Sequence, residues 1–137
     1  MDLHQAAREL FAGYLKAWND KDFSAVAACF DYPSVFVLPE ATVTLSDEAA
    51  LIALLERIFS GLEAENFSHS TVGSVVARRC NQEMAILDAR NVARLRGDGS
   101  VIENIDAHYV IKRREGQARF AVAIVCESGW QESKGNA

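Results

Sequence analysis

The chain has 137 residues, of which 50% are hydrophobic and 24% charged, a composition typical of one globular domain and unlike that of disordered or collagenous chains. Its formal net charge of -5 argues against general binding to nucleic acid, which depends on Lys and Arg neutralising phosphates. The charge is uneven, since residues 1–66 hold four basic and eleven acidic side chains and residues 67–137 hold ten basic and eight acidic ones. The second half therefore leaves room for an anionic ligand.

The three cysteines indicate neither a zinc site nor a redox pair. Cys29, Cys80 and Cys126 lie far apart in apolar stretches, without the close spacing that either would need. The opening "MDLHQAAREL" lacks the design of a signal peptide, and no apolar run approaches the roughly eighteen residues that span a bilayer. We therefore expect reduced thiols and a soluble cytoplasmic protein with no membrane partner.

The first part of the chain predicts two helices and a strand. One stripe of a first helix holds apolar residues at intervals of three and four: Leu3, Ala7, Leu10, Tyr14 and Trp18. "NDKD" breaks this helix, and Asp20 or Asp22 is expected to cap a second one. The inward side of the second helix holds Phe23, Val26, Ala27 and Phe30. Pro33 ends the helical run, and the β-branched and aromatic "SVFVL" that follows predicts a strand.

A third helix is predicted after this strand. Ser46 is expected to cap it, with Asp47 and Glu48 in the first turn, where the helix dipole favours acidic groups. Its apolar stripe consists of Leu51, Leu55, Ile58 and Leu62.

From Phe67 onward the pattern is that of strands. Three long runs cover about 67–80, 83–96 and 101–114, and a last one covers about 118–127. "GDGS" predicts a hairpin turn, because glycine tolerates positive φ, and Gly116 indicates another turn. Residues 128–137 are expected to form a flexible tail. Helices followed by a long antiparallel sheet indicate an α+β fold, in which the helices cover one face and make a cup.

Over about residues 5–127 the chain resembles the NTF2-like superfamily, also called SnoaL-like or ketosteroid-isomerase-like. The resemblance is carried by the segments "YLKAWNDKDF", "SAVAACF", "LSDEAALIALLERIF" and "AILDARNVARLRGDGSVIENIDAHYVI" and by their order. It implies a single domain, residues 1–127, with a cone-shaped curved antiparallel sheet wrapped around three N-terminal helices. It also implies a cavity inside the cone and frequent homodimers, in a family that holds isomerases, cyclases and dehydratases beside members that only bind or assemble.

The predicted hairpin gives a register between the two longest strands. With Asp98 and Gly99 as the turn, Asn91 faces Asp106, Ala89 faces His108, and Arg94 faces Glu103. One sheet face then gathers three polar groups beside two small alanines: Asn91, Asp106, His108, Ala89 and Ala93. This face is either the wall of a ligand pocket with an acid-base site or a wet outer surface or dimer interface.

Tyr14 carries the sharpest single likeness to the ketosteroid isomerases, in which a tyrosine at this point of the first helix stabilises an enolate. Aligned from Tyr14 without a gap, the position of their proton-transferring carboxylate falls on Leu38, which cannot move a proton. The position of their second acid falls on Ala107. A faithful ketosteroid isomerase is therefore not expected, and the alternative for Tyr14 is plain packing on a helix stripe.

Three further residues are candidates for a ligand site. Trp18 is either core or an aromatic wall of the cavity. His69 is expected on the strand face of Phe67, from which it either enters the cavity opposite His108 or stays structural. Glu40, at the mouth of the cup, is either a ligand contact or a solvated loop carboxylate.

Two classes of function follow from these residues. The first is an isomerase, dehydratase or cyclase that acts on a small apolar organic molecule by acid-base chemistry, without cofactor or metal. Its catalytic residues are Asp106, His108 and Tyr14, and its ligand contacts are Trp18, Asn91, His69 and Leu38. The second is a non-catalytic ligand-binding module or dimeric assembly module.

Overall fold

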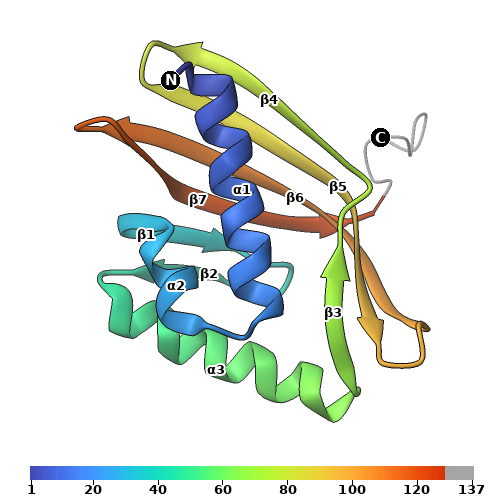
Figure 1. Cartoon of the computed structure of the whole chain (residues 1–137). Coiled ribbons are helices and arrows are strands. Elements are labelled where there is room, and N and C mark those ends of the chain that lie inside the picture. Colours follow the sequence, from blue (N-terminus) through green and yellow to red (C-terminus); the bar gives the residue numbers. More distant parts are fainter. Residues whose placement is uncertain (129–137) are drawn as a thin grey trace.

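The computed structural model describes residues 1–128 and is an α+β fold in which three helices pack on one curved sheet (Figure 1). The helices are α1 (Leu3–Asn19), α2 (Phe23–Ala28) and α3 (Glu48–Ala64). The strands are β1 (Phe30–Val37), β2 (Thr42–Leu45), β3 (Phe67–Thr71), β4 (Ser74–Asn81), β5 (Met84–Arg96), β6 (Val101–Arg114) and β7 (Gln117–Glu127). All but Ser128 of the predicted tail lies outside the described residues.

Each helix begins at an aspartate whose carboxylate accepts a backbone N–H of the first turn. Asp2 caps α1. Asp22 caps α2, which is one of the two caps predicted for that helix, Asp20 and Asp22. The cap of α3 is Asp47, which accepts from the backbone N–H of Ala50, so the prediction of Ser46 is wrong by one residue. A carboxylate there also interacts favourably with the helix dipole, which gives Asp47 the advantage over Ser46.

The sheet runs in the order β2-β1-β7-β6-β5-β3, and β4 pairs with the other half of β5. All of its pairs are antiparallel except β1 with β7, so the sheet is mixed rather than antiparallel throughout. Strands β5, β6 and β7 form an antiparallel meander, and β1 pairs with its edge strand β7 in the parallel direction. Strand β2, residues 42–45, has no counterpart in the sequence-based prediction.

The sheet bends where β5 changes partners. The run predicted as one strand over 67–80 is two strands that meet at Gly73, whose N–H donates to the carbonyl oxygens of Arg90 and Asn91. Asn91 has φ of 54°, and the β5–β6 register shifts beside it, which marks a bulge. A Cβ on Gly73 would lie 2.9 Å from the Asn91 Cβ, so this close approach requires glycine. The bulge curves the sheet around α1 (Figure 1).

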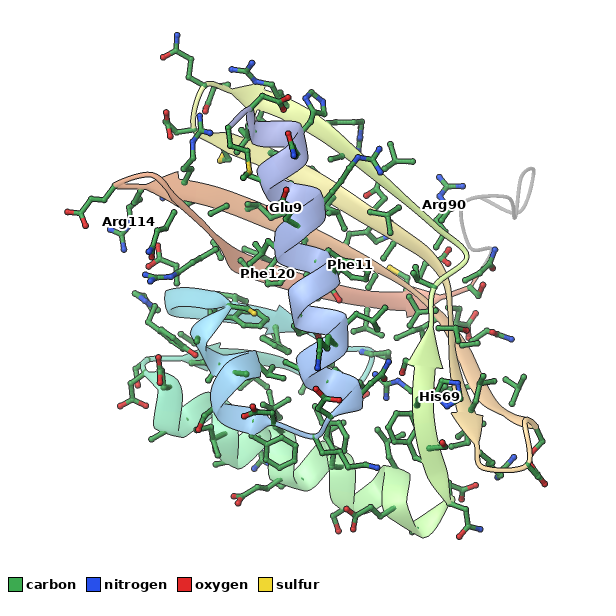
Figure 2. All side chains as sticks on the ribbon, in the orientation of Figure 1. Glu9, Phe11, His69, Arg90, Arg114 and Phe120 are labelled. Atoms are coloured by element: carbon green, nitrogen blue, oxygen red, sulfur yellow. The ribbon has the colours of Figure 1, made fainter. Side chains whose placement is uncertain are left out.

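Aromatic side chains fill the space between the helices and the sheet face that they cover, here called the inner face. Phe11 on α1 and Phe120 on β7 lie in this layer (Figure 2). The Tyr14 ring contacts the rings of Phe11, Trp18, Phe30, Tyr109 and Phe120 at centroid distances of 5.1–6.1 Å. The cone therefore has a packed aromatic centre, and any sizeable space must lie toward its rim.

None of the helices among residues 1–128 is long and apolar enough to cross a membrane. Over the same residues, no three His, Cys, Asp or Glu side chains converge as ligands of a metal ion would.

Candidate functional site

A cavity of about 290 Å³ opens at the rim of the cone, between α3, the β1–β2 turn and the ends of β5, β6 and β7. We call it the mouth cavity, and its lining consists of Leu38, Pro39, Glu40, Ile58, Arg94, Glu103, Asn104, Ile105, Val125, Cys126 and Glu127. The wall combines aliphatic side chains, such as Leu38, Ile58 and Ile105, with charged ones. A volume near 300 Å³ lies at the lower end of the range for small-molecule sites.

Arg94 is the central cation of this cavity. Its side chain is only 15% exposed, and its Nη1 donates to Glu103 Oε2 at 3.1 Å across the β5–β6 hairpin. The predicted pairing of these two residues is confirmed. The guanidinium also lies over the Trp18 ring, 5.3 Å from its centroid, in a cation–π contact that fixes its position.

Behind Arg94 lies a second space of about 30 Å³, the inner pocket, lined by α1, the inner face and Ser70 of β3. This volume has room for about one or two water molecules and is too small for a ring. Ser70 is 4% exposed, and its Oγ has no hydrogen-bond partner among the described residues. Arg94 and Ile105 line both spaces, so they form the boundary between the mouth cavity and the inner pocket.

Two tyrosine hydroxyls belong to the inner pocket. Burial raises the pKa of Tyr14, although a hydrogen bond with Tyr109 and the charge of Arg94 act in the opposite direction. Burial raises the pKa of Tyr109 well above its ordinary value of 10.0, and the Tyr14 hydroxyl adds to that rise. Both hydroxyls therefore stay protonated at neutral pH, where they can donate hydrogen bonds but cannot act as bases.

Four of the sequence-based candidates lie at these two spaces: Tyr14, Trp18, Leu38 and Glu40. Tyr14 and Trp18 are buried on α1 and line the inner pocket. Leu38 lines the mouth cavity beside Glu40, as expected for a loop at the mouth of the cup. Their contacts with a ligand stay predictions, and the dense ring contacts of Tyr14 show that it also serves the core.

Asp106 and His108 point away from this site. Their neighbours Ile105, Ala107 and Tyr109 line the inner pocket, and side chains alternate along a strand, so both residues belong to the opposite, outer face. Asp106 is 2% exposed, and its Oδ1 accepts the backbone N–H of Asn91 at 2.9 Å. The predicted convergence of Tyr14, Asp106 and His108 in one cavity is therefore wrong.

The error comes from the bulge in β5. The predicted register holds from Val92 to Arg94 but slips by one residue beyond Asn91, so that His108 pairs with Asp88 and not with Ala89. His108 Nδ1 lies 2.7 Å from Asp88 Oδ1, and Arg78 Nη2 donates to the other carboxylate oxygen at 3.2 Å. Asn91 sits in the bulge, exposed, where its Oδ1 accepts from Ser128 Oγ.

His69 is also outside the cavities described above. It is exposed on β3, and its Nδ1 lies 3.1 Å from Ser68 Oγ (Figure 2). The register of β3 against β5 shifts between Phe67 and His69, so the two do not share a face as the alternation predicted. Ser70 enters the inner pocket instead.

Five residues that line the two spaces were not predicted from the sequence as site residues: Arg94, Ser70, Ile58, Ile105 and Val125. The sequence-based register paired Arg94 with Glu103 correctly. It placed the polar residues Asn91, Asp106 and His108 on the opposite face, however, and that face was predicted to line the pocket. Two residues could have indicated the bulge. Glycine, at Gly73, allows close approach of another chain segment, and asparagine, at Asn91, tolerates positive φ.

A curved, unclosed mixed sheet with helices on its inner face and a cavity at its rim defines the NTF2-like class of α+β proteins. The chain belongs to the family described as "NTF2-like protein (DUF6841)", whose model matches residues 4–128. The resemblance inferred from the sequence is thereby confirmed. No curated protein matches the sequence.

Solved structures share the fold at low sequence identity. An NTF2-like protein with a cystatin-like fold from Novosphingobium aromaticivorans matches with a TM-score of 0.76 and 17% identity, over 97% of this chain and 83% of that one. A domain of unknown function from Nostoc punctiforme matches with a TM-score of 0.73 and 16% identity, over 90% and 76% of the two chains. An NTF2-like protein of unknown function from Pseudomonas putida matches with a TM-score of 0.72 and 13% identity, over 90% and 84%.

Proposed function

We propose that this protein binds a small, mainly apolar organic molecule in the mouth cavity. The observation that carries the proposal is the coexistence of a packed cone centre with an open space of about 290 Å³ walled by Leu38, Ile58 and Ile105. An aliphatic wall with a few fixed polar groups is the usual composition of a ligand pocket. The Arg94–Glu103 pair supplies those polar groups.

Titration with p-cresol, a neutral one-ring probe, tests the proposal by NMR. Saturable shifts are expected at the backbone amides of Leu38, Ile58 and Val125. Ile58→Trp fills the cavity and should abolish them. Val76→Trp is the matched control, because Val76 is 46% exposed on the outer face and should leave binding intact. Shifts that survive Ile58→Trp, or that map to the outer face, would refute the proposal.

Binding without catalysis has the better support, because Arg94 and Glu103 at the mouth cavity form an ion pair and the two tyrosines of the inner pocket stay protonated at neutral pH. An acid-base role for His108 rests on its contact with Asp88, which orients the imidazole. That role needs a substrate on the outer face. It predicts that His108→Ala lowers a measured turnover on the order of a hundredfold.

We further propose that the outer face forms a homodimer. Half-buried aliphatic side chains adjoin one another there across β1, β7, β6 and β5: Val35, Val37, Val122, Ile124, Val110 and Ile86. No helix covers this face among the described residues, and such a stripe is the usual core of a self-complementary interface.

Light scattering at micromolar concentration tests the dimer. The wild type should have twice the mass of one chain, and Val122→Asp should halve it. Val101→Asp, at an exposed position in the β5–β6 hairpin, is the control that should leave the mass unchanged. A wild type that is only monomeric contradicts the dimer and leaves ligand binding untouched.

A further inference from the structure

The guanidinium of Arg94 has unused hydrogen-bonding capacity at the wall of a cavity. Among residues 1–128 it makes one hydrogen bond, from Nη1 to Glu103, although the group carries five N–H donors. Its side chain is 15% exposed and lines the mouth cavity, so a ligand in that cavity can reach the remaining donors. A largely buried guanidinium with unused donors beside open space is a binding group for an acceptor that comes from outside the chain.

The geometry of Arg94 favours a planar anionic acceptor. Glu103 accepts from Nη1, and the guanidinium lies over the Trp18 ring, which leaves the edge with Nε and Nη2 without a hydrogen-bond partner among residues 1–128. A carboxylate fits such an edge with two parallel hydrogen bonds. Because the cation–π contact with Trp18 holds Arg94 in place, less conformational entropy is lost when the anion binds.

The remainder of the cavity is suited to an apolar body attached to that carboxylate. Leu38, Ile58 and Val125 line the space around Arg94. The volume of about 290 Å³ accommodates one ring with a short side chain. The inner pocket behind Arg94 has a volume of about 30 Å³ and is too small to accept a ring. The apolar part of the ligand must therefore lie in the mouth cavity.

The acidic residues of the cavity are the competing observation. Glu40, Glu103 and Glu127 also line it and would favour a cation by charge alone. All three are exposed, however, and solvent screens exposed charges far more than buried ones. Glu103 is in addition already paired with Arg94. Arg94 is less exposed than these carboxylates, so its charge is screened less and acts more strongly on a ligand held inside the cavity.

We propose that the ligand is a small aromatic or aliphatic monocarboxylate whose carboxylate binds the free edge of Arg94. This inference rests on the proposed function and adds the chemical class of the ligand. Glu103 then acts as a specificity-determining residue, because its negative charge beside the same guanidinium weakens the binding of anions.

Three probes of nearly equal shape test the inference by calorimetry: phenylacetate, phenylacetamide and phenethylamine. The wild type should bind phenylacetate on the order of tenfold more tightly than phenylacetamide, because only the carboxylate makes charge-assisted bonds. In Arg94→Gln the preference for the acid over the amide should fall to within about twofold. Circular dichroism would show whether that variant is folded.

A second variant keeps the test decisive even where Arg94→Gln does not fold. Glu103→Gln frees Arg94 and should tighten phenylacetate binding several-fold, on the order of fivefold, with little effect on phenylacetamide. Glu127→Gln is the matched control, since it removes the same charge from the same cavity but Glu127 makes no ion pair with residues 1–128, and its effect should be smaller.

The outcomes separate the two proposals. Equal binding of acid and amide in the mouth cavity, or preferential binding of phenethylamine, overturns the carboxylate inference and leaves the proposed function standing. Binding of none of the three probes overturns both. Equal effects of Glu103→Gln and Glu127→Gln would refute the specific role of Glu103.

Discussion

Removal of the Tyr14 hydroxyl separates the packing role of this residue from its polar role. In Tyr14→Phe all five aromatic ring contacts are retained, so the change removes only the hydroxyl and its hydrogen bond with Tyr109. The lost bond costs about 1 kcal/mol, and the Tyr109 hydroxyl left without a partner in a buried place adds about 1 kcal/mol more. We expect a free energy of unfolding lower by about 2 kcal/mol.

A double-mutant cycle with Tyr109→Phe isolates the interaction between the two hydroxyls. Each single variant leaves one buried hydroxyl unpaired, whereas Tyr14→Phe with Tyr109→Phe leaves none and loses the bond only once, so the double variant should be more stable than the sum of the single effects predicts, by about 3 kcal/mol. Urea unfolding at constant m-value measures each term. For a chain of this size, 1 kcal/mol also corresponds to about 3–4 °C in Tm.

Two results would refute this reasoning. Single effects that add to within about 0.3 kcal/mol would show that the hydroxyls do not interact. A fall in p-cresol affinity larger than the loss of stability in Tyr14→Phe would show that Tyr14 contacts the ligand directly. The structure predicts an affinity change of less than about twofold, because Tyr14 lines the inner pocket and not the mouth cavity.

The remaining predictions concern the bend and the titration of the core. Gly73→Ala should destabilise the protein by about 1–3 kcal/mol, because its Cβ would lie 2.9 Å from that of Asn91, while Gly61→Ala, in open space on α3, should stabilise it by about 0.5–1 kcal/mol. Equal urea midpoints for the two variants would contradict this account of the bend. Because burial raises the folded-state pKa of Tyr14 and Tyr109, their contribution to stability is complete below about pH 10 and should be lost as the pH rises beyond it. Urea midpoints between about pH 8 and 11 should fall less steeply in the Tyr14→Phe, Tyr109→Phe variant, and parallel curves would contradict the shifts.

The helices and the order of elements could be predicted from the sequence because they depend on local patterns. The stripe from Leu3 to Trp18 on α1 and Asp22 at the start of α2 express helix periodicity and capping, which act within a few residues. The hairpin at 97–100 likewise set the pairing of Arg94 with Glu103 correctly. These interactions involve residues close together in the sequence, so a local pattern predicts them.

The site could not be predicted to the same extent, because one inserted residue reverses the faces of a strand. The bulge at Asn91 depends on the approach of Gly73 from the connection between β3 and β4, which no local pattern of β5 reports. His108 was therefore assigned to the cavity and Arg94 was not. The mixed sheet was missed for a related reason, since the pairing of β1 with β7 joins segments about ninety residues apart.

A crystal structure of the protein soaked with p-cresol tests the central claim most directly, because it shows where a small apolar molecule resides. The account predicts density for the ring in the mouth cavity, in contact with Leu38, Ile58 and Val125 and beside the Arg94–Glu103 pair. Density confined to the outer face near His108, or a mouth cavity closed by side chains with no probe bound at saturating concentration, would contradict it.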